Sequence, residues 1–296
     1  MTSSSWRYAD TLKDPDVEEP INLALHRPLA FQLLRPLERW RVRPTPNQIT
    51  LLSGLFGFSA AFVAYAAATR GAHLLPVAGG LLLISVILDC CDGMLARLVG
   101  ASSELGRILD GGMDFFVGIA VGIGMGAAAV EHVATPWTLA LVVAIFPSMV
   151  AHAAVFDHLR QRFAQLTGPE RQVSSDSTQS AASRGPLAWA LETVYRHLYT
   201  PVARAVTGAG DRPRPAGVSP EQARAELRRP MRMAGWLGVG THFAILYASM
   251  IAAALAPSLP LWSCTILVTV ALNVWMLVTA SAWRRAEARL LARAAD

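Results

Sequence analysis

Six long apolar stretches dominate the pattern of hydrophobic and polar positions along this chain. Each is free of charge or nearly so, and most are close to the roughly 20 residues that an α-helix needs to cross the hydrocarbon core of a bilayer. The pattern predicts membrane-spanning helices over residues 49–69, 74–96, 108–130, 136–156, 234–256 and 259–283. Because these spans use nearly half of the chain, a large soluble catalytic domain is excluded.

Two further segments intersperse apolar residues with polar ones, a pattern typical of helices that lie in the headgroup plane. In residues 20–43 large apolar side chains stand among arginines, and Pro28 and Pro36 are expected to break the helix into pieces. The alternative for this segment is a cytoplasmic helix packed on the bundle. Residues 186–206 have a similar pattern. The predicted fold is an all-α integral membrane protein with six transmembrane helices and cytoplasmic or interfacial amphipathic helices.

Changes in polarity along the chain divide it into five parts. They are a cytoplasmic segment with the interfacial helix, the first four spans, a cytoplasmic insertion with an amphipathic helix, the last two spans, and a cytoplasmic tail. In chain order these parts are residues 1–47, 48–163, 164–231, 232–283 and 284–296.

Charge is scarce and unevenly placed. Only 16% of the residues are charged and 53% are hydrophobic, and all of the 26 Lys and Arg except Arg70 lie in residues 1–47, 97–107, 157–233 or after 283. Since positive charge is retained on the cytoplasmic face, both termini and these segments should be cytoplasmic in a multi-pass protein of the inner or plasma membrane. The positive balance therefore reports orientation, and no nucleic-acid partner is expected. The acidic start of the chain lacks the apolar core of a cleavable signal peptide.

Four aspartates, Asp89, Asp92, Asp110 and Asp114, stand where the second and third spans meet the cytoplasm. Acidic side chains are costly there and indicate function by default. At 100° per residue, the first two share one helix face and the last two share another. The turn between the spans is short, so we expect antiparallel neighbours that present both pairs of carboxylates to one cleft.

Converging carboxylates repel one another and require cations or raised pKa values. No His or Cys completes a softer site, and an all-oxygen set favours Mg²⁺ or Mn²⁺ over zinc. Cys90 and Cys91 point away from the carboxylate face and should pack as small apolar residues. Two ions around a diphosphate suit in-line phosphoryl transfer, which is the leading hypothesis. The alternatives are a divalent-cation transporter that uses the aspartates and a non-catalytic scaffold.

Small and basic residues accompany the aspartates. Gly93, Ala96 and Gly106 leave room for a ligand to lie against backbone, and the planar cation of Arg97 suits phosphate or one of the aspartates. Four arginines at helix ends could bind a phosphorylated acceptor or act as orientation anchors: Arg107, Arg160, Arg162 and Arg232. Glycines at intervals of four in the third span predict close helix packing, within the chain or at a dimer seam: Gly118, Gly122 and Gly126.

Residues 89–114 reproduce the pattern D-x2-D-G-x2-A-R-x8-G-x3-D-x3-D at every fixed position. In this the chain resembles the CDP-alcohol phosphotransferases, also called CDP-alcohol phosphatidyltransferases. Residues 45–50 (TPNQIT) are similar to the P-N-x-[IL]-T sequence of that family, which lines its nucleotide pocket. By physical chemistry alone this hexapeptide is a helix start, with Thr45 as a possible cap and Pro46 in the first turn.

The resemblance implies a six-helix membrane enzyme, commonly a homodimer, that binds a CDP-linked donor at its cytoplasmic side with two divalent metal ions, Mg²⁺ or Mn²⁺. An alcohol acceptor would displace CMP from this donor. The family assigns the metal ions to Asp89, Asp92, Asp110 and Asp114, with Asp114 also the general base. It assigns the nucleotide or its diphosphate to Asn47, Thr50, Gly93, Ala96, Arg97 and Gly106.

The signature does not separate CDP-diacylglycerol from a CDP-headgroup as the donor. Residues 26–50 look loosely like the start of members related to di-myo-inositol phosphate phosphate synthases. That similarity leans toward an inositol or polyol headgroup in the synthesis of phospholipids or related polar lipids.

Overall fold

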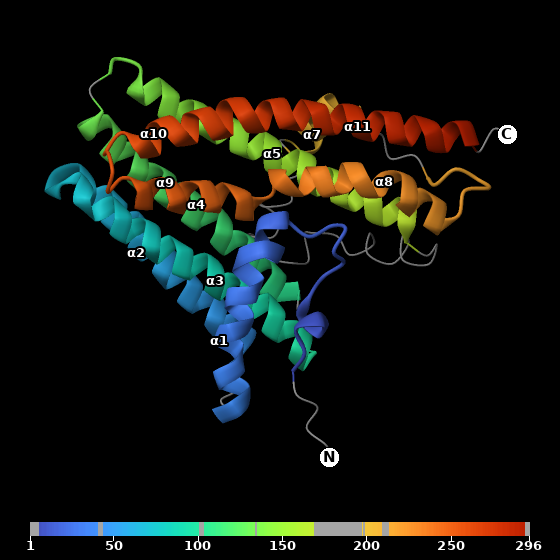
Figure 1. Ribbon diagram of the computed structural model, residues 1–296, viewed down its shortest axis with the longest axis horizontal. Coiled ribbons are helices and arrows are strands. Elements are labelled where there is room, and N and C mark those ends of the chain that lie inside the picture. Colours follow the sequence, from blue (N-terminus) through green and yellow to red (C-terminus); the bar gives the residue numbers. More distant parts are fainter. Residues whose placement is uncertain are drawn as a thin grey trace. The chain divides into compact units, whose positions relative to one another are not determined.

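The structure is a computed structural model that describes residues 6–40, 44–100, 104–133, 135–168, 197, 199–208 and 213–293. Of residues 104–111 it describes the helical backbone alone. These parts of the chain contain helices and no strand, as predicted (Figure 1). Much of the predicted insertion at residues 164–231, including most of the amphipathic segment 186–206, lies outside the described residues.

Six helices are long and apolar enough to cross a membrane, which confirms the predicted number. They are Pro46–Arg70, Ala72–Val99, Gly112–His132, Thr138–Thr167, Pro220–Ala252 and Leu259–Arg293. The last three extend past the apolar stretches that predicted them. The additional turns are amphipathic, so they can bury one face against neighbouring helices while the other face stays polar. A search for apolar stretches does not include such turns.

The described residues form two compact units. The first contains residues up to Pro15, Glu19–Phe146 and Gly240–Thr269. The second contains Asp16–Glu18, Pro147–Val239 and the residues from Val270 onward.

Helix α2 (Pro46–Arg70) starts as the hexapeptide predicts. The Thr45 hydroxyl accepts a hydrogen bond from the Gln48 backbone at 3.3 Å, and the Gln48 side chain accepts one from the Thr45 backbone at 2.9 Å. This reciprocal capping box satisfies two backbone donors that the first turn leaves open. Pro46 follows directly, where its missing N–H costs nothing.

Helix α2 is the shared partner of α3 (Leu75–Val99) and α4 (Glu104–His132). Figure 1 shows α2 and α3 side by side. A Cβ on Gly57 of α2 would lie 2.6 Å from Val117 of α4 and 3.0 Å from the Ser85 hydroxyl of α3. We expected α3 and α4 to pack directly on each other. Among the described residues, each makes its main contacts with α2 instead, because small residues on α2 let both approach.

The glycines of α4 are used for packing within the chain. A Cβ on Gly122 would lie 2.6 Å from Phe146, and one on Gly126 would lie 2.8 Å from Val142, both on α5 (Thr138–Thr167). Gly118 faces Phe243 of α9 (Val239–Ala252). Of the two interpretations of this spacing, the structure supports close packing inside one chain.

Helix α1 (Arg27–Trp40) follows a single π-helical turn, η2 (Asn22–His26), and packs against α3. The cluster beneath it includes Cys90 and Cys91, which confirms their packing role. The prediction that prolines would break this segment is wrong at Pro36, which lies inside α1. Packing on α3 offsets the one hydrogen bond that a proline removes. Exposed apolar side chains also occur on α1, among them Leu33 and Trp40, which suits a lipid surface.

The second unit has its own apolar core, which includes Trp283 of α11 (Leu272–Arg293) and Leu227 of α8 (Pro220–Ala234). The unit also contains the part of α5 from Pro147 onward, the short helix α7 (Thr200–Thr207) and the 3₁₀ turn η7 (Gly235–Leu237). The last span joins α10 (Leu259–Cys264) to α11 through a π-helical stretch, η8 (Thr265–Ala271).

Candidate active site

The first carboxylate pair lies on α3, one helical turn apart. Asp89 is partly exposed, whereas the whole of Asp92 is only 4% exposed. A carboxylate at this depth in an otherwise apolar helix needs hydrogen-bond donors or cations to remain ionised.

One donor to Asp92 comes from α2. The Thr50 hydroxyl, on a residue that is 3% exposed, donates to Oδ2 of Asp92 at 2.5 Å. The Thr50 hydroxyl oxygen also lies 3.1 Å from the Pro46 carbonyl. A hydroxyl has one proton, and the nearer carboxylate oxygen is the stronger acceptor. This bond joins the TPNQIT segment directly to the aspartate signature. Asn47, one turn before Thr50 on α2, is partly exposed.

The second carboxylate pair belongs to α4. Asp114 is partly exposed. The backbone of Gly106 and Asp110 is helical, which places Gly106, Asp110 and Asp114 on one face as predicted. The side chain of Asp110 lies outside the described part of the structure.

Helix α2 contacts both of the carboxylate-bearing helices near its own start. Thr50 bonds Asp92 of α3, and one turn later Gly54 lies against the sulfur of Met113, the residue before Asp114 on α4. The absent side chain of Gly54 is therefore what allows α4 to approach at this point. That the two carboxylate pairs share one cleft stays a prediction, and the contact that both helices make with α2 is compatible with it.

Arg97 has a partner that the sequence did not indicate. Its Nε donates to the backbone carbonyl of Thr11 at 2.6 Å, in the turn η1 (Tyr8–Thr11). Its two terminal nitrogens lie 3.6 and 3.7 Å from where a Cβ on Gly93 would be. Ala96, between them on α3, is partly buried. No sequence signal could have revealed this contact, because a backbone carbonyl is common to every residue.

Asp89 and Asp92 are oxygen donors one turn apart, which suits Mg²⁺ or Mn²⁺. Among the side chains that the structure describes, no group of three or more His, Cys, Asp and Glu is placed to hold an ion. Asp110, the residue that would extend the pair, is not among them. The donors present fit a hard cation in type.

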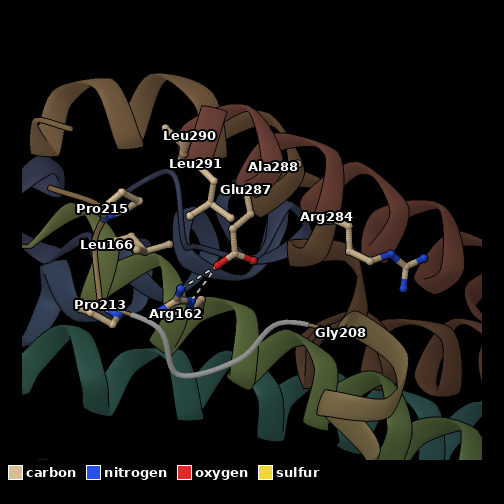
Figure 2. Close-up of a pocket in the computed structure, with 10 residues that line it drawn as sticks. All are labelled: Arg162, Leu166, Gly208, Pro213, Pro215, Arg284, Glu287, Ala288, Leu290 and Leu291. Atoms are coloured by element: carbon tan, nitrogen blue, oxygen red, sulfur yellow. Dashed lines mark hydrogen bonds and ion pairs between the residues drawn. The ribbon is translucent and has the colours of Figure 1, made fainter. Parts of the chain in front are cut away.

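A separate cavity of about 240 Å³ lies in the second unit. Figure 2 shows Arg162 of α5 pointing toward Glu287 of α11, with two hydrogen bonds of 3.1 and 2.7 Å. None of the signature residues lines this cavity. The Arg162 side chain is 4% exposed and Glu287 compensates its charge. Arg162 therefore contributes to the packing of this unit, which favours the structural role over the acceptor-binding one.

Part of the chain matches a known protein family. Residues 43–171 match the family described as CDP-alcohol phosphatidyltransferase. This range contains the hexapeptide, both carboxylate pairs and the first four spans. A search of curated proteins finds no match to the chain.

Proposed function

Residues 43–171 form a CDP-alcohol phosphatidyltransferase domain, and from this premise we propose that the chain transfers a phosphatidyl or phosphoalcohol group from a CDP-linked donor to an alcohol, releasing CMP. The family and the six apolar helices make the protein an integral membrane transferase of phospholipid synthesis, with a CDP-alcohol donor and an alcohol acceptor. The donor that we propose is CDP-diacylglycerol or a CDP-headgroup, with an inositol or polyol headgroup preferred.

One observation carries the proposal: the buried hydrogen bond from Thr50 to Asp92. It connects the segment similar to the family's nucleotide-binding sequence with the aspartate signature, across 42 positions of the chain. A chance motif in a packing helix would not require a buried carboxylate, because an apolar residue would fill the same place at lower cost. The acid at this position is thus best explained by chemistry.

Asp114 is the proposed general base. As the acceptor hydroxyl approaches, the Asp114 carboxylate takes its proton, and the acceptor oxygen forms a bond with the donor phosphorus distal to cytidine. The bond between that phosphorus and the bridging oxygen breaks, and CMP leaves with that oxygen. Asn47, Thr50, Gly93, Ala96, Arg97 and Gly106 would bind and orient the nucleotide or its diphosphate.

Asp89, Asp92, Asp110 and Asp114 would hold two divalent ions, Mg²⁺ or Mn²⁺. Such ions neutralise the charge of the diphosphate and of the leaving oxygen. The proposal includes the orientation expected from the basic residues, with both termini and the active site cytoplasmic. It also includes the homodimer that the resemblance implies, which light scattering of the purified protein would test.

The test is incubation of the purified full-length protein with a panel of CDP-alcohols, alcohol acceptors and Mg²⁺ or Mn²⁺, with CMP release as the readout. We expect CMP release that depends on both substrates and is lost in Asp92→Asn, which keeps the shape of the side chain. CMP release from no combination would reject the proposal. Metal flux into proteoliposomes without CMP release would identify the transporter alternative.

A further inference from the structure

We propose that the turn Tyr8–Thr11 is a positioning element of the active site, which orients Arg97 toward the diphosphate of the donor. The inference rests on the proposed function and extends it to a segment that precedes the domain match at residue 43. The residue that acts is Thr11, through its backbone carbonyl, and it acts on the substrate only through Arg97.

The geometry of the contact fixes the direction of the guanidinium. Because the three nitrogens of arginine are coplanar, the 2.6 Å bond from Nε to the Thr11 carbonyl sets where the two terminal nitrogens point. These nitrogens lie close to Gly93, one turn back toward Asp92, at van der Waals distance from where a Cβ of that residue would be. The Thr11 carbonyl is a neutral acceptor, so this bond orients the guanidinium and leaves its positive charge in place.

The turn itself is firmly held. Thr11 is fully buried, and its hydroxyl donates to the Tyr8 carbonyl at 2.6 Å. The Tyr8 ring meets Phe31 of α1 edge-on, with 5.4 Å between ring centroids. The Trp6 backbone donates to the Glu38 carboxylate, also on α1, at 2.7 Å. The turn is held on α1 and Arg97 belongs to α3. Because α1 packs on α3, the positions of the turn and of Arg97 are fixed relative to each other.

This arrangement has a kinetic consequence. An arginine side chain loses much rotamer freedom when it binds a ligand, and ordering it in advance removes that cost from binding. Loosening the turn should therefore raise the KM for the CDP-linked donor by roughly 2- to 10-fold. The KM for the acceptor and kcat should change less, because in this proposal Arg97 takes no part in the proton transfer or in binding the acceptor.

The experiment compares full-length Thr11→Val and Tyr8→Ala with the wild-type protein in the CMP assay. Thr11→Val removes the hydroxyl that closes the turn while conserving side-chain shape, and Tyr8→Ala removes the ring that holds the turn on α1. Lys13→Ala, an exposed position just beyond the turn, is the matched control and should behave as wild type. Each variant is combined with Arg97→Lys, which keeps the charge but lacks the Nε donor.

If the turn acts through Arg97, either turn variant should raise the donor KM in the wild-type background and add nothing to Arg97→Lys. Thr11→Val is the reference where Tyr8→Ala lowers the yield of folded protein. Equal effects of the turn variants with and without Arg97→Lys would overturn the inference, as would an unchanged donor KM in Thr11→Val. An inactive wild-type protein would instead reject the proposed function itself.

Discussion

In the pairing of Thr50 with Asp92, a buried hydroxyl supplies the hydrogen bond that a buried carboxylate needs. An isolated threonine in a spanning helix usually bonds a carbonyl of the preceding turn, and Thr50 also lies near that of Pro46. Its shorter contact is to the carboxylate of Asp92, which thereby has a hydrogen-bond donor in an apolar setting. Thr50 and Asp92, which belong to separate motifs of the sequence, are thus joined by one hydrogen bond.

Thr50→Val is predicted to destabilise the protein by about 1–3 kcal/mol, because the buried carboxylate loses a hydrogen-bond donor. Thr50→Ser should retain most of the stability. Thr69→Val, at an exposed position of the same helix, is the matched control and should be nearly neutral. Thermal unfolding in detergent measures all three, and equal melting temperatures for Thr50→Val and Thr69→Val would show that the bond contributes nothing.

Asp114→Asn is predicted to lower CMP release by about 10²- to 10⁴-fold while cytidine nucleotide binding is largely preserved, since the amide cannot accept the proton of the acceptor. Steady-state CMP release and calorimetric titration with a CDP-alcohol measure the two effects. Glu131→Gln, an exposed acid at the far end of α4, serves as control. Undiminished turnover would remove Asp114 as the base.

At the scale of elements, α2 is the helix on which both carboxylate-bearing helices, α3 and α4, pack. Its glycines and alanines allow α3 and α4 to approach it closely, and two reciprocal hydrogen bonds between Ser53 and Ser85, of 3.0 and 2.8 Å, fix the register against α3. Hydrogen bonds between polar side chains and backbone are a common way to join helices in lipid. The geometry of the proposed active site therefore depends on residues that have no chemical role of their own.

Gly57→Ala is predicted to cost about 1–3 kcal/mol, because the added methyl would lie 2.6 Å from Val117 and force α4 away from α2. Gly80→Ala is the matched control, since a Cβ there meets nothing within 4 Å and alanine favours the helix. In Gly57→Ala both the melting temperature and the rate of CMP release should fall. In Gly80→Ala neither should change. A neutral Gly57→Ala would mean that α4 is not held by this contact.

At the scale of the whole chain, the segment before α1 is tied to α9, more than 200 residues away. His26 is fully buried and bonds Asn22 at 2.7 Å and the Tyr247 hydroxyl at 3.0 Å. The Glu19 carboxylate accepts from the Thr241 backbone at 3.1 Å, at the start of α9. All these residues belong to the first unit, so the contacts join the N-terminal segment of that unit to α9.

Burial lowers the pKa of His26 to about 4 from its ordinary value of 6.5. Above pH 6.5 the imidazole is neutral whether the chain is folded or unfolded. Between pH 6.5 and 4 His26 is protonated in the unfolded chain but not in the folded chain. The free energy of unfolding should therefore fall by about 3 kcal/mol as the pH is lowered across this window.

Melting temperatures across that pH range measure the effect. His26→Gln should reduce the slope, whereas His73→Gln, at an exposed position, should keep it. An identical slope in His26→Gln would show that another group governs the pH dependence.

Orientation is a property of the whole chain that single-cysteine labelling can measure. The native cysteines are buried, so an introduced cysteine supplies the accessible thiol. Arg70→Cys is predicted to react with a membrane-impermeant maleimide in intact cells, and Lys13→Cys only after permeabilisation, because positive residues are retained in the cytoplasm. The reverse pattern would invert the proposed orientation.

The sequence by itself determined the six spans, the capped start of α2, the packing of Cys90 and Cys91, and the family signature. Each of these depends on local periodicity, composition or fixed spacing, which a chain carries in its order of residues. The tertiary structure alone decided that α2 stands as the shared partner of α3 and α4, that α1 continues through Pro36, and that Thr11 holds Arg97. These follow from contacts between distant segments, and a contact through glycine or a backbone carbonyl leaves no distinctive residue type to read.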